Sequence, residues 1–323
     1  MDVKLSTPII GKRIKKRSRT ADFLIRLFKE QPLGALGAVI TLILALTGIF
    51  ANFLAPYDPG HMDLLIRMAP PSAQHLLGTD QIGRDIFSRI IYGCRIDMLI
   101  GLAATSIAAF FATVIGVLSG YIGGTFDVIL QRFIDALMSF PGLLLLMTIM
   151  TLIGSGLIQI TIVLGILFSI GSSRIIRGSV MSIKENVYIK ASQAIGSSTL
   201  NTLVRHILPN IMPTIIIIFS ANIGGIILAE SSLSFLGFGI TVGTPSWGGM
   251  LSWEGRKFME INPNLAIWPG VALSIAVFGL NMFGDAVRDL LDPRLRGGVG
   301  RYVSANISKI KAKINREKEN TVV

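Results

Sequence analysis

Residues 172–210 read SSRIIRGSVMSIKENVYIKASQAIGSSTLNTLVRHILPN, a polar and basic stretch set between two strongly apolar ones. Within it, residues 188–195 contain no Pro or Gly and predict a short helix. Gly196 follows at the place where a helix commonly ends in a left-handed residue. Ser197 or Ser198 can then cap a second helix, so the stretch predicts a helix-turn-helix.

The second of these helices is predicted to carry an apolar stripe. Its apolar residues recur at helical spacing, at positions 200, 203, 204, 207 and 208. Pro209 lacks an amide donor, and we expect it to end the helix. Too polar to enter a bilayer, the element either docks on a protein partner or lies back as a surface loop on its own bundle.

The composition indicates an integral membrane protein. Of 323 residues, 51% are hydrophobic and 15% are charged, whereas soluble domains average about 25% charged. A single cysteine excludes an intrachain disulfide and a thiolate metal centre, and three distant histidines argue against any other metal site. The net charge of +11 lies mostly in the two tails, which suggests anionic lipid as the partner and not nucleic acid.

Six stretches are long and apolar enough to cross a bilayer, which takes about 20 residues. We expect spans at 33–54, 98–120, 211–229 and 265–284, and a hairpin of two spans in 136–173, broken at 154–156. The second span is rich in small residues, which let helix backbones approach closely, so we expect it inside the bundle.

The distribution of positive charge predicts the orientation. With six spans, one side of the membrane holds 24 Lys and Arg residues and the other side holds 6. The positive-inside rule then places both termini and residues 172–210 in the cytoplasm, the compartment that contains ATP.

Three further polar features stand beside the spans. On the outer side, Asp80 is expected to cap an interfacial amphipathic helix with Arg84, Asp85 and Arg89 on its polar face. Arg132 and Asp135 are expected to pair at the cytoplasmic edge, near Asp127. Glu230 is expected near the outer mouth of the bundle, either attracting a cationic group or capping neighbouring amides.

The sequence lacks the usual motifs of an enzyme. It contains no GxxxxGK[ST] phosphate loop, no HExxH, no CxxC and no plausible GxSxG elbow. We therefore expect a transport subunit, with no cofactor bound by this chain. A channel, a secondary transporter that uses no ATPase and a purely structural scaffold remain as alternatives.

The stretch YIKASQAIGSSTLNTLVRHILPN resembles the coupling signature of the inner-membrane permeases of binding-protein-dependent ABC importers, an EAA triplet, three residues, Gly, nine residues, then IxLP. Three more stretches resemble the second permease of the dipeptide, oligopeptide and nickel group: LGTDQIGRDIFSRIIYGCRID, SLSFLGFG with PSWGGML, and NMFGDAVRDLLDPRLR. The likeness covers roughly residues 30–296. Lys190, Ser192 and His206 depart from the signature, and Asp97 departs from the group's usual Ser.

The resemblance implies an all-α membrane protein with six transmembrane helices, the type I importer permease fold and a cytoplasmic coupling helix. By it, the tails are 1–31 and 291–323, the first span is 32–55, the external segment is 56–97, and the permease core is 98–290 with the coupling loop 172–210. The implied ATPase-coupling residues are Tyr188, Lys190, Ala191, Ser192, Ala194, Gly196, Leu208 and Pro209, and the candidates for a substrate path are Glu230 and Asn222.

The same resemblance implies the partners. They are a second, homologous permease, two cytoplasmic ATPases that carry ATP and Mg, and an extracytoplasmic binding protein, all at a bacterial or archaeal plasma membrane. The imported substrate is implied to be a dipeptide, an oligopeptide or a related solute such as glutathione or a nickel chelate.

Overall fold

The computed structural model describes residues 19–241 and 243–291, so most of both predicted tails lies outside the described residues. In the described part every regular element is helical, which confirms the predicted all-α class. The helices are α1 Arg19–Glu30, α2 Pro32–Ile49, α3 Ala51–Leu54, η1 Leu64–Ile66, α4 Ile86–Ile122, α5 Gly124–Met138, α6 Gly142–Ile153, α7 Leu157–Lys184, α8 Val187–Ala194, α9 Thr199–Thr202, η2 Leu203–Ile207, α10 Leu208–Phe235, α11 Trp247–Gly249, η3 Met250–Gly255, α12 Arg256–Phe258 and α13 Asn264–Leu291.

Long apolar helices dominate the molecule. Five helical stretches in the described part are long and apolar enough to span a membrane: α2, α4, α7, α13 and the continuous helix Thr199–Phe235 that includes α10. A sixth span is formed if α5 and α6, which meet at 89°, count as one broken span.

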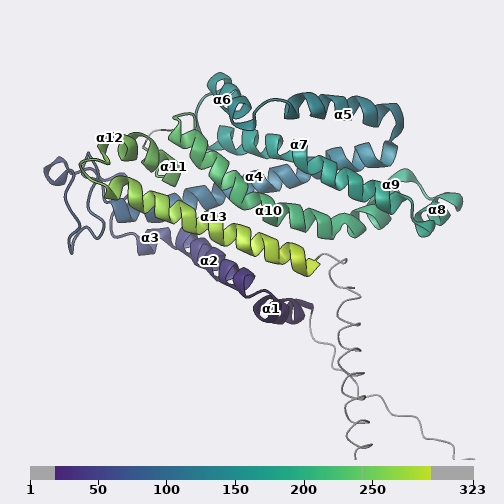
Figure 1. The fold of residues 1–323 in the computed structure, drawn as a ribbon, viewed down its shortest axis with the longest axis horizontal. Helices are drawn as coiled ribbons and strands as arrows, with labels where there is room; N and C mark the ends of the chain where they lie inside the picture. The colour runs from purple at the N-terminus through teal and green to yellow at the C-terminus, as the bar shows by residue number, and fades with distance from the viewer. Residues whose placement is uncertain (1–18, 242, 292–323) are drawn as a thin grey trace, which may run out of the picture.

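The long helices lie side by side and alternate in direction (Figure 1). The start of α2 and the end of α13 point to the right-hand end in that view, where α8 and α9 also lie, and α1 packs against both α2 and α13. The segment before α4, together with α11 and α12, lies at the opposite end. The predicted helix-turn-helix therefore shares one end of the bundle with both ends of the described chain.

Close contact between α4 and α7 forms the centre of the bundle. A Cβ added to Gly116 on α4 would lie 2.6 Å from the carbonyl oxygen of Ser173 on α7, and one added to Gly120 would lie 2.9 Å from that of Arg177. Ala104, Ala108 and Ala112 on α4 are fully buried. Small residues thus bring the two backbones together, and the prediction that this span lies inside the bundle is confirmed.

The expected hairpin of two spans in 136–173 is wrong in its boundaries. The chain already turns into α5 at Gly124, breaks between Met138 and Gly142, and continues as the 12-residue helix α6. Helix α7 then runs on to Lys184, well past the expected end. Since Pro141 cannot donate a backbone hydrogen bond, the break falls there and leaves α6 about 18 Å long, too short to cross a bilayer alone.

The interfacial helix predicted in the external segment is also wrong. The helix begins at Ile86, capped by Asp85, and runs without a break into the second span. Asp80 lies in the preceding turn, where its carboxylate accepts hydrogen bonds from the Arg84 backbone (2.9 Å) and from the Arg84 Nε (2.6 Å). Arg84, Asp85 and Arg89 are buried, so they form no solvent-facing side. Arg84 pairs with Asp80, Asp85 accepts a hydrogen bond from the Ser88 amide, and Arg89 donates one to the Pro59 carbonyl.

Candidate functional site

The loop between α7 and α10 folds as the predicted helix-turn-helix. Helix α8 ends at Ala194, and Gly196 adopts φ +81°, the left-handed conformation that the sequence predicted. The Ser198 hydroxyl caps α9 by accepting a hydrogen bond from the Asn201 amide at 3.3 Å. We call residues 187–202 the two-helix loop.

One isoleucine of this loop and one of the turn that follows it anchor the region to the bundle. Ile189 from α8 and Ile207 from η2 are fully buried in one apolar cluster with Ile176 and Val180 of α7 and Ala112 of α4. The loop therefore cannot move independently of α7, because Ile189 is packed in the same apolar cluster as side chains of that helix.

The two-helix loop exposes three large apolar side chains. Val187 is 83% exposed, Ile195 is 87% exposed and Leu200 is 71% exposed. Lone exposed apolar residues are ordinary, but three on one short element at the end of a bundle are typical of a protein-docking surface. The alternative of a loop folded back on its own bundle applies only to the inner side, where Ile189 is buried.

The eight predicted coupling residues lie on this element and the turn that follows it. Tyr188, Lys190, Ala191, Ala194, Gly196 and Pro209 are exposed, and Ser192 and Leu208 are half-buried. Lys190 Nζ lies 2.7 Å from Glu185 Oε2, and this contact lowers the pKa of the Glu185 carboxyl. Lys190 thus has an acidic partner within the chain itself.

Pro209 does not end the helix as predicted. Residues Leu203–Ile207 form a π-helical turn, and the Leu208 amide donates to the carbonyl of Leu203, five residues back. The wider turn accommodates a proline, whose ring would clash with a carbonyl four residues back in a regular α-helix. The helix therefore continues as α10 to Phe235 and joins the loop directly to a span.

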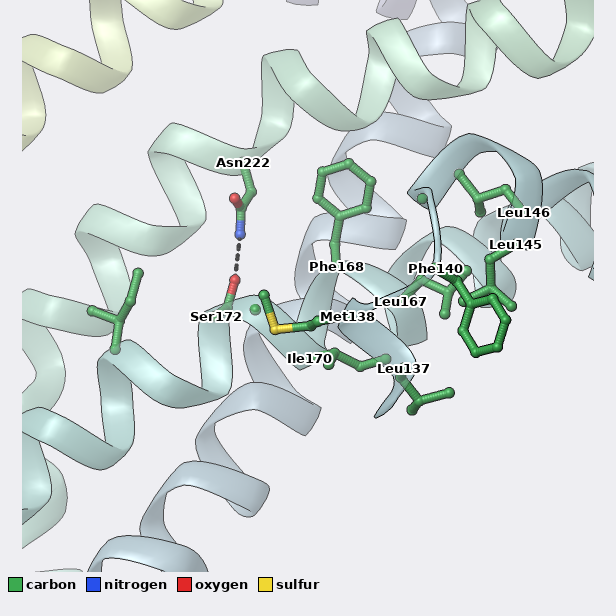
Figure 2. A pocket seen from close by; sticks show the side chains of 13 residues that line it. Leu137, Met138, Phe140, Leu145, Leu146, Leu167, Phe168, Ile170, Ser172 and Asn222 are labelled. Atoms are coloured by element: carbon green, nitrogen blue, oxygen red, sulfur yellow. Dashed lines mark hydrogen bonds between the residues drawn. The ribbon is translucent and has the colours of Figure 1, made fainter. Parts of the chain in front are cut away.

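A second site lies at the break between α5 and α6. A cavity of about 450 Å³ opens there against α7 and α10, as Figure 2 shows. The cavity is lined mainly by Leu137, Met138, Phe140, Leu145, Phe168 and Ile175. Its polar side chains are Asn222, one of the two candidates for a substrate path, and Ser172, whose hydroxyl accepts a 2.9 Å hydrogen bond from the Asn222 amide.

Glu230, the other candidate, lies elsewhere. It is fully buried, and its carboxylate accepts hydrogen bonds from the Ser234 hydroxyl at 2.6 Å and the Ser231 hydroxyl at 3.2 Å. The following serines on α10 therefore satisfy the carboxylate inside the protein, and its expected role near an outer mouth, attracting a cationic group or capping neighbouring amides, stays a prediction. Of the two candidates, only Asn222 lines the cavity.

Sequence reasoning missed the other residues that build this cavity. Ser172 was only the first residue of a polar stretch, and Phe140 was placed inside a continuous span. The dipeptide Pro141-Gly142 was the available signal, because it favours a break in a helix. The pairing of Ser172 with Asn222, 50 residues apart, had no local signal.

The hydrogen-bonded pair of Asn222 and Ser172 is the polar feature of the cavity. In the described part of the chain, no group of three or more His, Cys, Asp or Glu side chains could hold a metal ion. The arrangement can offer one amide to a hydrogen-bonding solute and apolar walls to the rest of it.

Comparisons with known proteins cover most of the chain. Residues 112–297 match the family described as binding-protein-dependent transport system inner membrane component, and residues 18–71 match the N-terminal TM domain of oligopeptide transport permease C. The chain is 37% identical over 273 residues to the glutathione transport system permease proteins GsiD of Escherichia coli O6:K15:H31 and Shigella boydii serotype 4, which covers 84% of this chain and 90% of each relative.

Two solved structures also resemble the chain. Both are inward-facing crystal forms of the MetNI methionine ABC transporter, at 19% identity. One has a TM-score of 0.46 and covers 59% of this chain and 93% of that chain, and the other has a TM-score of 0.49 and covers 64% and 97%.

Proposed function

The chain belongs to the family of binding-protein-dependent transport system inner membrane components, and from this premise we propose that it forms half of the path by which an ATP-driven importer takes up small peptides. As a member, it is a membrane permease subunit of an ABC importer, a class that works with ATPase and binding-protein subunits. The remaining half of the path is proposed to come from a second, homologous permease.

The proposed substrate class is a dipeptide, an oligopeptide or glutathione. The relatives named as glutathione permeases support it. The cavity supports it too, since about 450 Å³ lies within the size range of small-molecule sites. The Asn222 amide can hydrogen-bond a peptide group while the leucine and phenylalanine walls accommodate an apolar side chain.

The proposed coupling site is the loop around residues 188–209. The ATPases, which carry ATP and Mg, are proposed to receive the exposed apolar side chains of Val187, Ile195 and Leu200 in a cleft. Both termini are proposed to be cytoplasmic, because 24 of the 30 Lys and Arg residues then lie on the inner side.

The observation that carries the proposal is the two-helix loop itself, which exposes its apolar side chains and continues directly into the spans α7 and α10. A channel or secondary transporter has no need of such a surface. The structural scaffold and the ATPase-free transporter are accordingly set aside.

Purification in mild detergent from the native membrane tests the proposal. We expect a second permease and P-loop ATPase subunits to co-purify, and the complex in vesicles, supplied with its binding protein, to take up labelled glutathione or dipeptide only with ATP. A chain that purifies alone and hydrolyses no ATP would contradict the importer function.

Variants of the cavity test the path. Asn222→Leu keeps roughly the same side-chain size but removes the amide. A neutral hydrogen bond contributes about 0.5–1.5 kcal/mol, so its loss should raise the KM for peptide uptake roughly 2- to 10-fold. Ser232→Ala is the matched control, because the hydroxyl of that half-buried serine on α10 bonds within its own helix, to the carbonyl of Leu228.

A further inference from the structure

Helix α5 is attached to the bundle mainly by charge. Ile134 is its only buried residue, and its apolar side chains Phe126, Val128, Ile129 and Phe133 are exposed. Apolar packing therefore holds α5 weakly, whereas a helix of a packed bundle normally buries a continuous stripe.

Two ion pairs join α5 to α7. Asp127 receives two hydrogen bonds from the Arg177 guanidinium, from Nε to Oδ1 at 2.6 Å and from Nη2 to Oδ2 at 2.5 Å. Asp135 pairs with Arg174, one turn earlier on α7. The predicted pair of Arg132 with Asp135 is also present within α5, at 3.8 Å, and is confirmed.

The geometry of the first pair favours a rigid connection. A bidentate pair of arginine and carboxylate fixes orientation as well as distance. Asp127 also accepts a hydrogen bond from the Ser119 hydroxyl of α4, and the Gln131 amide donates to that hydroxyl at 3.1 Å. Asp127 and Asp135 stand eight residues apart, about 12 Å along α5, so two attachments fix its tilt.

Both helices lead from these pairs to a functional element. Toward the end of α7, the helix continues from Arg177 to Lys184, and the two-helix loop begins at Val187. In the other direction, Leu137 and Met138 follow Asp135 at the end of α5, and both line the cavity. The cavity wall and the loop are therefore joined through one pair of helices.

We propose that the ion pairs Asp127 with Arg177 and Asp135 with Arg174 make α5 and α7 a single rigid lever, which carries displacement of the two-helix loop to the wall of the cavity. The four side chains are positioning residues. They touch no substrate, and they act by moving Leu137 and Met138 when α7 moves. The inference rests on the proposed function, because the displacement is taken to come from the ATPase partners.

Transport per ATP hydrolysed, measured on the whole complex in vesicles, tests the lever. Asp127→Asn and Arg177→Gln should each lower that ratio at least about fivefold, the lower end of typical allosteric coupling, while ATP hydrolysis continues. The double variant with Asp127→Arg and Arg177→Asp should recover most of the loss, which a merely destabilised fold would not do.

Arg26→Gln is the matched control, since Arg26 is an exposed cation on α1, a helix that packs against α2 and α13. Its ratio of transport to hydrolysis should equal that of the parent. Single variants with the parent ratio, or a reversed pair no better than either single variant, would overturn the proposal.

Spin-label distances separate this inference from the choice of substrate. Labels at Val128→Cys on α5 and at Ser182→Cys, an exposed position near the end of α7, should keep their separation when ATP is added to the complex in a Cys94→Ser background. The distance from 182 to a label at Leu36→Cys on α2 should change instead. In Asp127→Asn the separation between 128 and 182 should change as well.

A parent complex in which the separation between 128 and 182 changes as much as that between 182 and 36 would show that α5 does not follow α7. A complex in which neither distance responds to ATP would also overturn the lever. Absence of peptide uptake with both distances behaving as expected would contradict the proposed substrate and leave the lever standing.

Discussion

Replacing Gly196 by Val tests the turn of the two-helix loop. Gly196 adopts φ +81°, and a Cβ added there would have no atom within 4 Å, so the substitution meets backbone strain and no clash. For a residue with a Cβ, the left-handed conformation costs about 1–2 kcal/mol. That cost lowers the population of the native turn roughly 5- to 30-fold relative to competing loop conformations.

The assay is ATPase activity stimulated by the loaded binding protein, measured in the reconstituted complex alongside peptide uptake. We expect uptake by Gly196→Val to fall by about that 5- to 30-fold factor, with little loss of melting temperature, because Gly196 is in an exposed turn. Gly196→Asn should be intermediate, since Asn tolerates the left-handed region better than Val.

Gly178→Ala is the matched control. Gly178 lies within α7, where an added Cβ likewise meets no atom within 4 Å, and its φ is not positive. It should transport like the parent. Parent-like uptake by Gly196→Val, or equal effects of Val and Asn, would refute the reasoning that the left-handed turn sets the geometry of docking.

Three further predictions address packing and charge. Gly116→Val should lower the melting temperature, because its Cβ would lie 2.6 Å from the Ser173 carbonyl oxygen and overpacking costs about 1–3 kcal/mol. Gly171→Ala should leave the melting temperature unchanged, because a Cβ added there has no atom within 4 Å. Equal thermal shifts in the two variants would contradict the tight contact of α4 and α7. Asp97→Ala should lower the free energy of unfolding by about 1–3 kcal/mol, because the buried Trp247 amide, which donates to the Asp97 carboxylate at 3.0 Å, then lacks an acceptor. An unchanged melting temperature would show that another group accepts this hydrogen bond. Lys190→Met should raise the pKa of Glu185 toward its ordinary value, as followed by carboxyl ¹³C NMR in nanodiscs. Because folding lowers the pKa of Glu185, any stabilisation by this pair is present above the ordinary pKa of the carboxyl and is lost as the pH falls through the lowered pKa. The Lys190 and Glu185 side chains are 60% and 70% exposed, so the melting temperature of Lys190→Met should equal that of the parent.

Local patterns predicted much of the fold and of the two-helix loop. The helix-turn-helix, the left-handed Gly196 and the interior position of the small-residue span followed from helical spacing, turn chemistry and residue size. These properties depend on residues close in sequence, which is why they can be read without a structure.

Other features could not be predicted because they depend on neighbours distant in sequence. Pro209 continues a helix since the preceding π turn makes room for it, and Glu230 is satisfied by serines that the packing of α10 encloses. The early start of α4 depends on a buried network around Asp80 and Arg84, whose charges looked solvent-facing in sequence.

The sequence by itself determined an all-helical membrane protein with a polar helix-turn-helix between its spans, because apolar length and turn residues are local signals. Its resemblance to the coupling signature implied a permease. Only the tertiary structure decided where the cavity lies and how it is joined to that element. The 89° break after α5 opens the cavity, and the contacts of Asn222 with Ser172 and of Asp127 with Arg177 each join residues 50 positions apart. Such contacts are fixed by packing and charge complementarity across helices, which no periodicity along the chain records.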